Sequence, residues 1–364
     1  MKVALVYDRV NKWGGAEQVL LVLHELFPDA PLYTSVYNKK TAGWANVFRI
    51  KTSFLQHMPY ATSAHEYYPL LMPIAFENFS FDVYDLVISV SSEAAKGIIT
   101  SEKTLHVCYL LTPTRYLWSG YEEYFKNSFF RFLSRPFVSY LRKWDKIASK
   151  RPDVFIAISD EVKKRIKKYY RREASVIYPP VYRKERGKGK GESRPGYFLV
   201  VSRLVGYKRI DLAIQACNEL GLSLKIVGIG SEAKNLKRIA GSTIEFLGLL
   251  THDRLLQYYK GCKALIFPGI EDFGLTVVEA QSNGKPVIAF RGGGALETIE
   301  ENKTGMFFAP QTNTALVDVL EIFDKKRFSS KACRENAQKF SRQRFKKEFS
   351  KMVQNLLKER MNTI

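Results

Sequence analysis

The chain has 364 residues, of which 46% are apolar and 26% are charged, a globular composition that excludes disorder and fibrous repeats. At roughly 150 residues per domain, this length predicts two domains, each able to bury its own core. Lys and Arg together number 57 against 36 Asp and Glu, so the formal net charge is +21. Such an excess indicates anionic partners: phosphorylated metabolites, nucleic acid or a membrane surface.

The cysteines Cys108, Cys217, Cys262 and Cys333 lie far apart without a CxxC pair, and we expect buried, reduced thiols. Met1–Asp8 has too few apolar residues for a signal peptide. The longest nearly uncharged stretch, near Tyr67–Phe76, contains two prolines. We therefore expect a cytoplasmic protein that can touch the inner face of the cell membrane without crossing it.

The first half begins with a strand, a glycine turn and a helix. Val3–Tyr7 is a continuous apolar run, typical of a parallel strand that is covered on both faces, and the helical pattern Ala16–Phe27 follows. Ser159 is placed to cap a helix over Asp160–Tyr169. Further strands are expected at Leu86–Val90, Leu105–Leu111, Val154–Ile158 and Ser175–Tyr178.

A second alternation of strands and helices follows a Gly-, Lys- and Arg-rich stretch. This stretch predicts a linker at 183–195, between an N-terminal domain at 1–182 and a C-terminal domain at 196–344. Strands are expected at Tyr197–Val201, Ser223–Val227, Thr243–Leu247, Ala264–Phe267 and Pro286–Phe290. Helices are expected to begin at Arg209, Glu232, Asp253, Gly274 and Ala295, before a helical stretch at Arg334–Glu359. The pattern predicts an α/β fold with two doubly wound parallel sheets.

Two such domains would face a central cleft, and wound sheets bind ligands at the carboxyl ends of their strands. Five loops at such ends carry glycines or charges: Trp13–Glu17, Ser202–Lys208, Gly228–Glu232, Pro268–Glu279 and Arg291–Gly294. Each loop taken alone is equally compatible with an ordinary turn bearing solvated side chains. Their repetition at successive strand ends favours a ligand site.

The residue types in these loops suit a phosphorylated sugar. Paired glycines before a helix, Gly14 and Gly15, allow close approach of an anion, although the loop lacks the GxGxxG pattern of dinucleotide enzymes. Arg203 and Lys208 could bind a diphosphate. A carboxylate such as Glu271 or Glu279 could accept hydrogen bonds from the hydroxyls of a sugar or ribose.

Together, these segments resemble the retaining glycosyltransferases of family 4, which have the GT-B fold. The resemblance runs over essentially the whole chain. Within that family, the chain is similar to the WbaZ-type mannosyltransferases of O-antigen and polysaccharide assembly. The segments that carry this likeness are Ser53–Gln56, Tyr84–Ser89, Thr112–Trp118, Val176–Val181, Ser202–Ile214 and Arg291–Thr298.

The resemblance implies a role for each residue of these motifs. Arg203 and Lys208 would bind the donor diphosphate, and Glu271 would hold the donor sugar, so these three are the expected catalytic residues. Glu279 would accept from the ribose. The remaining donor contacts would come from Gly14, Gly15, Gly228, Gly230, Phe273, Gly274 and Leu275. A tail at about 345–364 would pack back on the N-terminal domain.

The resemblance also implies the reaction: transfer of a hexose, with mannose from GDP-mannose as the first candidate, onto a lipid-linked or polysaccharide acceptor. A UDP-sugar donor is the alternative, as is a degenerate sugar-nucleotide-binding protein with little turnover. The sequence has no DxD motif and no His, Cys or carboxylate cluster with metal-ligand spacing, so we expect no cofactor and no divalent metal.

The chain departs from the family near the reacting sugar. Leu111 and Ser92 stand where relatives commonly have histidines, so acceptor choice or activity could differ. The residues expected on the acceptor side are Leu111, Thr112 and Arg115.

Phe125–Lys150 interleaves aromatic and basic residues, a pattern that suits the headgroup layer of an anionic membrane. The alternative is that its aromatic side chains pack into the core. No nucleic-acid-binding module is recognisable, so nucleic acid is not an expected partner.

Overall fold

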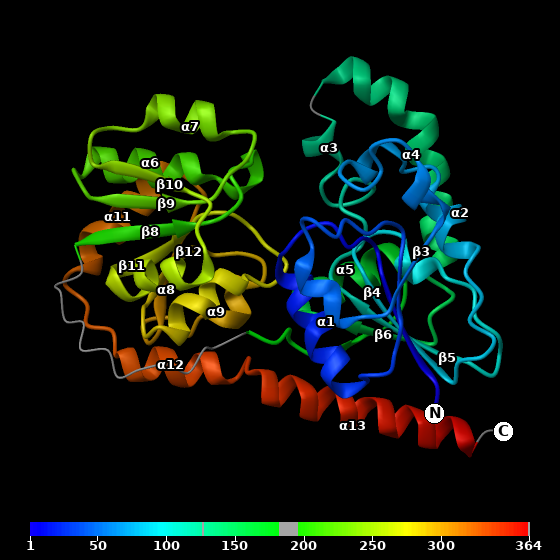
Figure 1. The fold of residues 1–364 in the computed structure, drawn as a ribbon. Coiled ribbons are helices and arrows are strands. Elements are labelled where there is room, and N and C mark those ends of the chain that lie inside the picture. Colours follow the sequence, from blue (N-terminus) through cyan, green and yellow to red (C-terminus); the bar gives the residue numbers. More distant parts are fainter. Residues whose placement is uncertain (126, 182–195, 363–364) are drawn as a thin grey trace. The chain divides into compact units, whose positions relative to one another are not determined.

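The structure is a computed structural model that describes residues 1–125, 127–181 and 196–362 (Figure 1). It consists of two compact units. Unit 1 is Met1–Pro180 with Phe345–Ile364, and unit 2 is Val181–Arg344. The linker expected at 183–195 lies outside the described residues.

Unit 1 is built on a seven-stranded parallel sheet of order β3-β2-β1-β4-β5-β6-β7. Its central strands are buried along their whole length, as their apolar sequences predict. The strands are β1 Val3–Tyr7, β2 Leu32–Thr34, β3 Ile50–Thr52, β4 Leu86–Ser91, β5 Leu105–Leu110, β6 Val154–Ala157 and β7 Ser175–Val176.

The helices of unit 1 are α1 Gly15–Leu26, α2 Met72–Glu77, α3 Tyr121–Tyr124, α4 Ser128–Ala148 and α5 Asp160–Tyr170. Short 3₁₀ turns are η1 Gly43–Val47, η2 Phe54–His57, η3 His65–Tyr67 and η4 Ala95–Gly97. The expected cap of α5 is confirmed, because the Ser159 hydroxyl accepts a hydrogen bond from the Val162 N–H at 3.1 Å.

Unit 2 is built on a six-stranded parallel sheet of order β10-β9-β8-β11-β12-β13. The strands are β8 Tyr197–Val201, β9 Leu224–Val227, β10 Ile244–Gly248, β11 Cys262–Phe267, β12 Val287–Phe290 and β13 Gly305–Phe308. The helices are η5 Gly206–Lys208, α6 Ile210–Glu219, α7 Ala233–Ile239, α8 His252–Gly261, α9 Leu275–Ser282, α10 Ala295–Thr298, α11 Asn313–Phe323 and α12 Ser330–Gln338. Two doubly wound α/β units are therefore confirmed.

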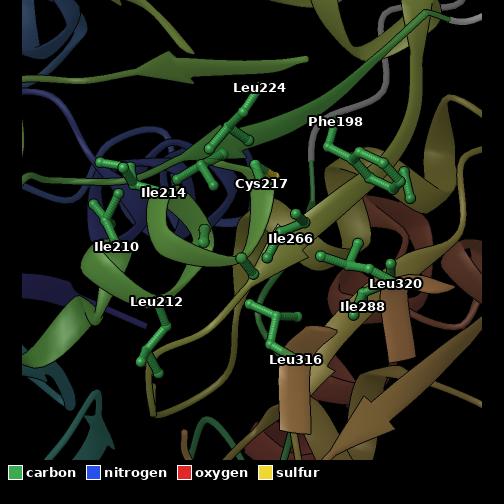
Figure 2. Packing of buried hydrophobic residues seen from close by; sticks show 14 of the residues in the cluster. Phe198, Ile210, Leu212, Ile214, Cys217, Leu224, Ile266, Ile288, Leu316 and Leu320 are labelled. Carbon is green, nitrogen blue, oxygen red and sulfur yellow. The ribbon is translucent and has the colours of Figure 1, made fainter. Parts of the chain in front are cut away.

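The core of unit 2 joins strands and helices that are distant in the sequence. Figure 2 shows Phe198 of β8, Ile266 of β11 and Leu316 of α11 in one apolar cluster. Each of these side chains is at most 2% exposed. This packing fixes the strand ends from which the loops of unit 2 leave the sheet.

The helical stretch expected at Arg334–Glu359 is two helices rather than one, because α12 ends at Gln338 and α13 spans Arg342–Met361. Between them, Phe340 turns inward and contacts the ring of Phe273 at 5.4 Å, and its carbonyl accepts from the Val181 N–H. A helical pattern does not reveal such a break, since the buried Phe340 fits the apolar spacing.

The last helix packs on unit 1 through two phenylalanines. Phe345 and Phe349 are fully buried, stack on each other at 5.5 Å and meet the ring of Tyr109 of β5 edge-on at 5.7 and 6.3 Å. The four cysteines are buried and unpaired, as expected. Burial raises the pKa of the Cys108, Cys217 and Cys262 thiols to about 12, so these groups stay protonated.

Candidate functional site

The strand order of unit 2 places the switch point of the sheet between β8 and β11. The chain runs from β8 outward to β9 and β10, then crosses to β11 on the other side of β8. The loops that leave the carboxyl ends of β8 and β11 therefore diverge, and ligands of open wound sheets bind at such a point. These loops carry Lys208 and Glu271, two of the residues singled out from the sequence.

Lys208 and Glu271 form an ion pair between the loops that leave β8 and β11. The Lys208 side chain is 7% exposed and that of Glu271 is 27% exposed, so the carboxylate lies nearer the surface. The Lys208 ammonium also lies 4.8 Å from the centre of the Tyr207 ring. The ion pair holds the Lys208 ammonium in a defined position at the strand ends, while the Glu271 carboxylate remains accessible to a ligand.

The Arg203 side chain lies at the same strand end as Lys208, after β8. Its guanidinium donates a hydrogen bond of 2.7 Å to the hydroxyl of Tyr207, and its side chain is exposed. Tyr207 is thus in contact with both Arg203 and Lys208. Two cations at one strand end suit an anion with several oxygens, such as a diphosphate.

Glycines allow these loops to pack backbone against backbone. A Cβ at Gly269 would lie 2.8 Å from the Lys208 Cα, which explains how the Glu271 loop comes within reach of Lys208. Gly294 packs equally closely against Phe273, and its N–H donates to the Glu271 carbonyl at 2.9 Å. The glycines of the Arg291–Gly294 loop therefore have a packing role.

Gly228 and Gly230, which follow β9, pack on the loop that carries Arg203. A Cβ would lie 1.8 Å from the Ser202 carbonyl oxygen at Gly228 and 2.2 Å from the Leu204 carbonyl oxygen at Gly230. Gly228 also has a φ of +140°, which other residues rarely adopt. These two glycines hold the β8 and β9 loops together beside the expected nucleotide pocket.

The loop that carries Glu271 leads into the amino end of α9. Gly274 adopts a φ of +88° at the start of the helix, and Leu275 is its first residue. The Phe273 side chain is buried, so at this position only its backbone would reach a ligand. The free N–H groups of a helix start attract negative charge, so this position suits a ligand oxygen.

Glu279 is held further along α9 by a hydrogen bond of 2.9 Å from the hydroxyl of Tyr259 on α8. Burial raises the pKa of Glu279 to about 7, although the Tyr259 hydrogen bond opposes the shift. The carboxyl group therefore changes charge near neutral pH. An ionised Glu279 accepts hydrogen bonds from hydroxyls better than its neutral form does.

This shift predicts a pH dependence of stability. Because the folded pKa is above the ordinary value of 4.5, the contribution of neutral Glu279 is full below pH 4.5 and is lost as the pH rises to about 7. We expect wild type to lose roughly 2–3 kcal/mol relative to Glu279→Gln between pH 5 and pH 8. Urea unfolding at several pH values measures this difference, and parallel curves for the two proteins would contradict it.

Two exposed apolar residues lie beside Gly228 and Gly230, and sequence reasoning did not single them out. Ile229 is 59% exposed and Leu249, which follows β10, is 77% exposed. The Gly228 N–H donates to the Gly248 carbonyl at 2.8 Å, so the two loops are adjacent. The available sequence signal was an aliphatic residue beside a glycine after a strand: Ile229 lies between Gly228 and Gly230, and Leu249 follows Gly248.

In unit 1, Gly14 and Gly15 begin α1, but an acidic side chain occupies the first turn of this helix. Glu17 is buried, accepts a hydrogen bond of 2.8 Å from the Tyr7 hydroxyl and would lie 3.1 Å from a Cβ at Gly14. Burial raises the pKa of Glu17. A phosphate at this helix start would therefore lie close to a buried carboxyl group.

The expected acceptor-side residues follow β5. The Leu111 N–H donates to the Ser91 carbonyl, which extends the pairing of β5 with β4 by one residue. Thr112 is buried, and its hydroxyl has no hydrogen-bond partner among the described residues. Arg115 is half-buried, and its carbonyl accepts from the Gly120 N–H in the turn that leads to α3.

The switch point of the unit 1 sheet lies between β1 and β4, and it holds charged residues that sequence reasoning missed. Asp8, directly after β1, accepts hydrogen bonds from the backbone of the loop after β4, beginning with Ser92. Arg9 pairs with Glu93 at 3.4 Å, and Glu93 also accepts from the Tyr116 hydroxyl at 3.0 Å. These charged residues follow two buried strands, and that position in the sequence is the feature from which they could have been found.

No group of three or more His, Cys, Asp or Glu side chains that could hold a metal is present in the described part of the chain. That the site needs no divalent metal remains a prediction.

Residues 181–340 match the family model described as "Glycosyl transferases group 1". An uncharacterized glycosyltransferase of Methanocaldococcus jannaschii is 28% identical over 207 residues, which make up 55% of this chain and 58% of that protein. A GDP-mannose-dependent alpha-(1-6)-phosphatidylinositol monomannoside mannosyltransferase of Mycobacterium tuberculosis is 28% identical over 184 residues, covering 42% of this chain and 48% of that protein. The chain spans about half the length of these curated relatives.

A solved structure is similar over nearly all of the chain. Anabaena Alr3699/HepE in complex with UDP has a TM-score of 0.70, covering 98% of this chain and 100% of that one at 18% identity. At this identity the likeness concerns the fold, and the expected GT-B architecture of two Rossmann-like domains is confirmed. The family match spans unit 2 from β8 to α12, which is less than half of the chain.

Proposed function

We propose that this protein is a glycosyltransferase that binds a nucleotide-sugar donor at the carboxyl end of the unit 2 sheet. The observation that carries the proposal is the Lys208–Glu271 ion pair at the switch point, with Arg203 alongside on Tyr207. Lys208 and Arg203 would bind the donor diphosphate and offset the charge that develops on the leaving nucleoside diphosphate. Glu271 would accept hydrogen bonds from the sugar hydroxyls.

The neighbouring loops fit the rest of such a donor. Glu279 would accept from the ribose hydroxyls, and the exposed Ile229 and Leu249 offer an apolar surface for the base. We propose GDP-mannose as the donor, in line with the mannosyltransferase of Mycobacterium tuberculosis, while the UDP complex of the Anabaena protein makes a UDP-sugar the second candidate.

The acceptor would be a lipid-linked sugar or a growing polysaccharide, held by unit 1. The loop that carries Thr112 and Arg115 and the polar cluster around Glu93 are the candidate contacts. Leu111 and Ser92 stand where the family resemblance implies histidines, so turnover is the property to test after binding. A protein that binds the donor without transfer would be a degenerate relative.

A thermal-shift panel tests the donor site directly. We expect GDP and GDP-mannose to raise the melting temperature, with or without EDTA, and UDP, UDP-glucose and UDP-N-acetylglucosamine to have little effect. At 100 times its dissociation constant a ligand adds about 2.7 kcal/mol, which is several degrees for a domain of this size.

The test variant is Lys208→Ala, which removes the buried cation and should abolish the shift in melting temperature. Val83→Ala, an exposed substitution in unit 1, should keep it. A shift confined to uridine ligands would replace GDP-mannose with a UDP-sugar. If no nucleotide shifted the wild-type melting temperature, the donor site itself would be refuted.

A further inference from the structure

Helix α4 carries two apolar faces, and only one of them is buried in unit 1. Val138 and Leu141 pack with Leu117, and each is at most 5% exposed. The other face is formed by side chains that are 50% to 65% exposed: Phe129, Phe132, Leu133, Phe137, Tyr140 and Ile147. We call these six residues the α4 stripe. Figure 1 shows α4 running along the border of unit 1.

The members of the α4 stripe lie on one side of the helix. Phe129, Leu133, Phe137 and Tyr140 follow one another at steps of three or four residues, the spacing that places side chains on a single side of a helix. Phe132 and Ile147 lie on the same side, because Phe132 follows Phe129 by three residues and Ile147 follows Tyr140 by two turns. From Phe129 to Ile147 the stripe extends about 27 Å at ~1.5 Å per residue. Folded proteins rarely leave so large an apolar surface in water unless it meets a partner.

The charges beside the α4 stripe are almost all positive. The helix contains one acidic residue, Asp145, which is fully buried and paired with Lys96 at 2.6 Å. Its outer surface therefore carries no anion. The basic residues of the helix are Arg131, Arg135, Arg142, Lys143 and Lys146.

Helix α5 extends this positive surface. Arg142 and Lys146 lie over the ring of Trp118 at 5.5 and 5.6 Å, and that ring also stacks on Tyr169 of α5 at 5.1 Å. Exposed lysines of α5 thus continue the cations of α4: Lys163, Lys164 and Lys168. Glu122 and Glu123 on α3 offset only part of this charge.

We propose that the α4 stripe inserts into the headgroup layer of an anionic lipid bilayer, with the flanking cations on lipid phosphates. Aromatic and aliphatic side chains at the interface, flanked by Arg and Lys, are the pattern of a helix lying in the membrane plane. No helix in the described ranges is long and apolar enough to span a bilayer. This surface does not depend on the donor site, so it goes beyond the proposed function.

Co-sedimentation of the full-length protein with vesicles tests the proposal. We expect binding to vesicles of phosphatidylcholine with phosphatidylglycerol, weak binding to phosphatidylcholine alone, and loss of binding in high salt. Phe132→Ser/Phe137→Ser should weaken binding by about tenfold or more, because it removes two inserted rings. Arg135→Glu/Lys143→Glu/Lys146→Glu should weaken it by about 100-fold.

Matched variants separate the α4 stripe from general hydrophobicity and charge. Val83→Ser/Ile99→Ser removes two exposed apolar side chains elsewhere in unit 1 and should bind as wild type does. Lys234→Glu/Lys237→Glu/Arg238→Glu makes the same charge change on α7 of unit 2 and should have a much smaller effect than the α4 triple variant. Circular dichroism establishes that each variant is folded.

Three results would overturn the proposal. They are no sedimentation with anionic vesicles, equal binding to neutral vesicles, and wild-type binding by both α4 variants. If the wild type instead self-associated in sedimentation velocity and Phe132→Ser/Phe137→Ser abolished this without any vesicle binding, the occupant would be a second copy of the chain. The thermal shift with nucleotides is a separate measurement that tests only the donor site. A failure of the donor site would therefore change none of the vesicle-binding results.

Discussion

Glu271→Ala is expected to lower kcat by about 10² to 10³, the loss measured when one contact to developing charge is removed from an active site. The substitution deletes the proposed acceptor of the sugar hydroxyls. It also leaves the Lys208 ammonium, only 7% exposed, without its carboxylate. Lys208 would then be free to move from the position in which it meets the diphosphate. The measurement is the initial rate of transfer or of donor hydrolysis, with the donor that the thermal-shift panel selects.

Two variants make the result specific. Glu271→Gln keeps the shape and one acceptor oxygen, so it should retain more activity than Glu271→Ala while losing the ion pair. Glu359→Ala, on the exposed side of α13, should match the wild type. If Glu271→Ala kept its rate within twofold of the wild type, the sugar-binding role of Glu271 would be wrong.

The positions of the donor-site residues could be predicted, but their pairing could not. Apolar runs identified β8 and β11 closely, so Lys208 and Glu271 were correctly assigned to loops after buried strands. Their ion pair depends on strand order, which the sequence does not display. It also depends on Gly269, which lets the two loops approach each other.

Short elements were missed for a different reason. Strands β2 and β3 have three residues each, too few to show a periodicity, and β13 and α11 lie beyond the last alternation that was recognised. Helix α10 is only one turn long, since it ends at Thr298.

The sequence pattern of α4 predicted a helix but did not show which of its faces is exposed. Both of its faces are apolar, so spacing alone cannot tell the buried Val138 and Leu141 from the exposed Phe132 and Phe137. Tertiary packing against Leu117 decides the orientation.

Asp8→Ala is expected to destabilise unit 1 by at least about 4 kcal/mol, a large share of the ~5–15 kcal/mol that stabilises most domains. The Asp8 carboxylate is fully buried and accepts four backbone hydrogen bonds. Its Oδ2 accepts from the Ser92 and Glu93 N–H groups at 2.6 and 3.0 Å. Its Oδ1 accepts from the Ala94 and Ala95 N–H groups at 2.9 and 2.8 Å. Each donor left unpaired in the interior costs about 1–3 kcal/mol.

The loss should appear as a fall of roughly 10 °C in the melting temperature of unit 1, followed by circular dichroism. Asp8→Asn keeps the shape but turns one acceptor into a donor, so it should also be unstable, although less so than Asp8→Ala. Asp82→Ala, which removes an exposed carboxylate of the same unit, should melt within about 1 °C of the wild type. Because the loop that Asp8 holds also carries Glu93, the Arg9–Glu93 pair should loosen with it. An Asp8→Ala protein as stable as Asp82→Ala would mean that this loop is fixed by its other contacts and not by the carboxylate.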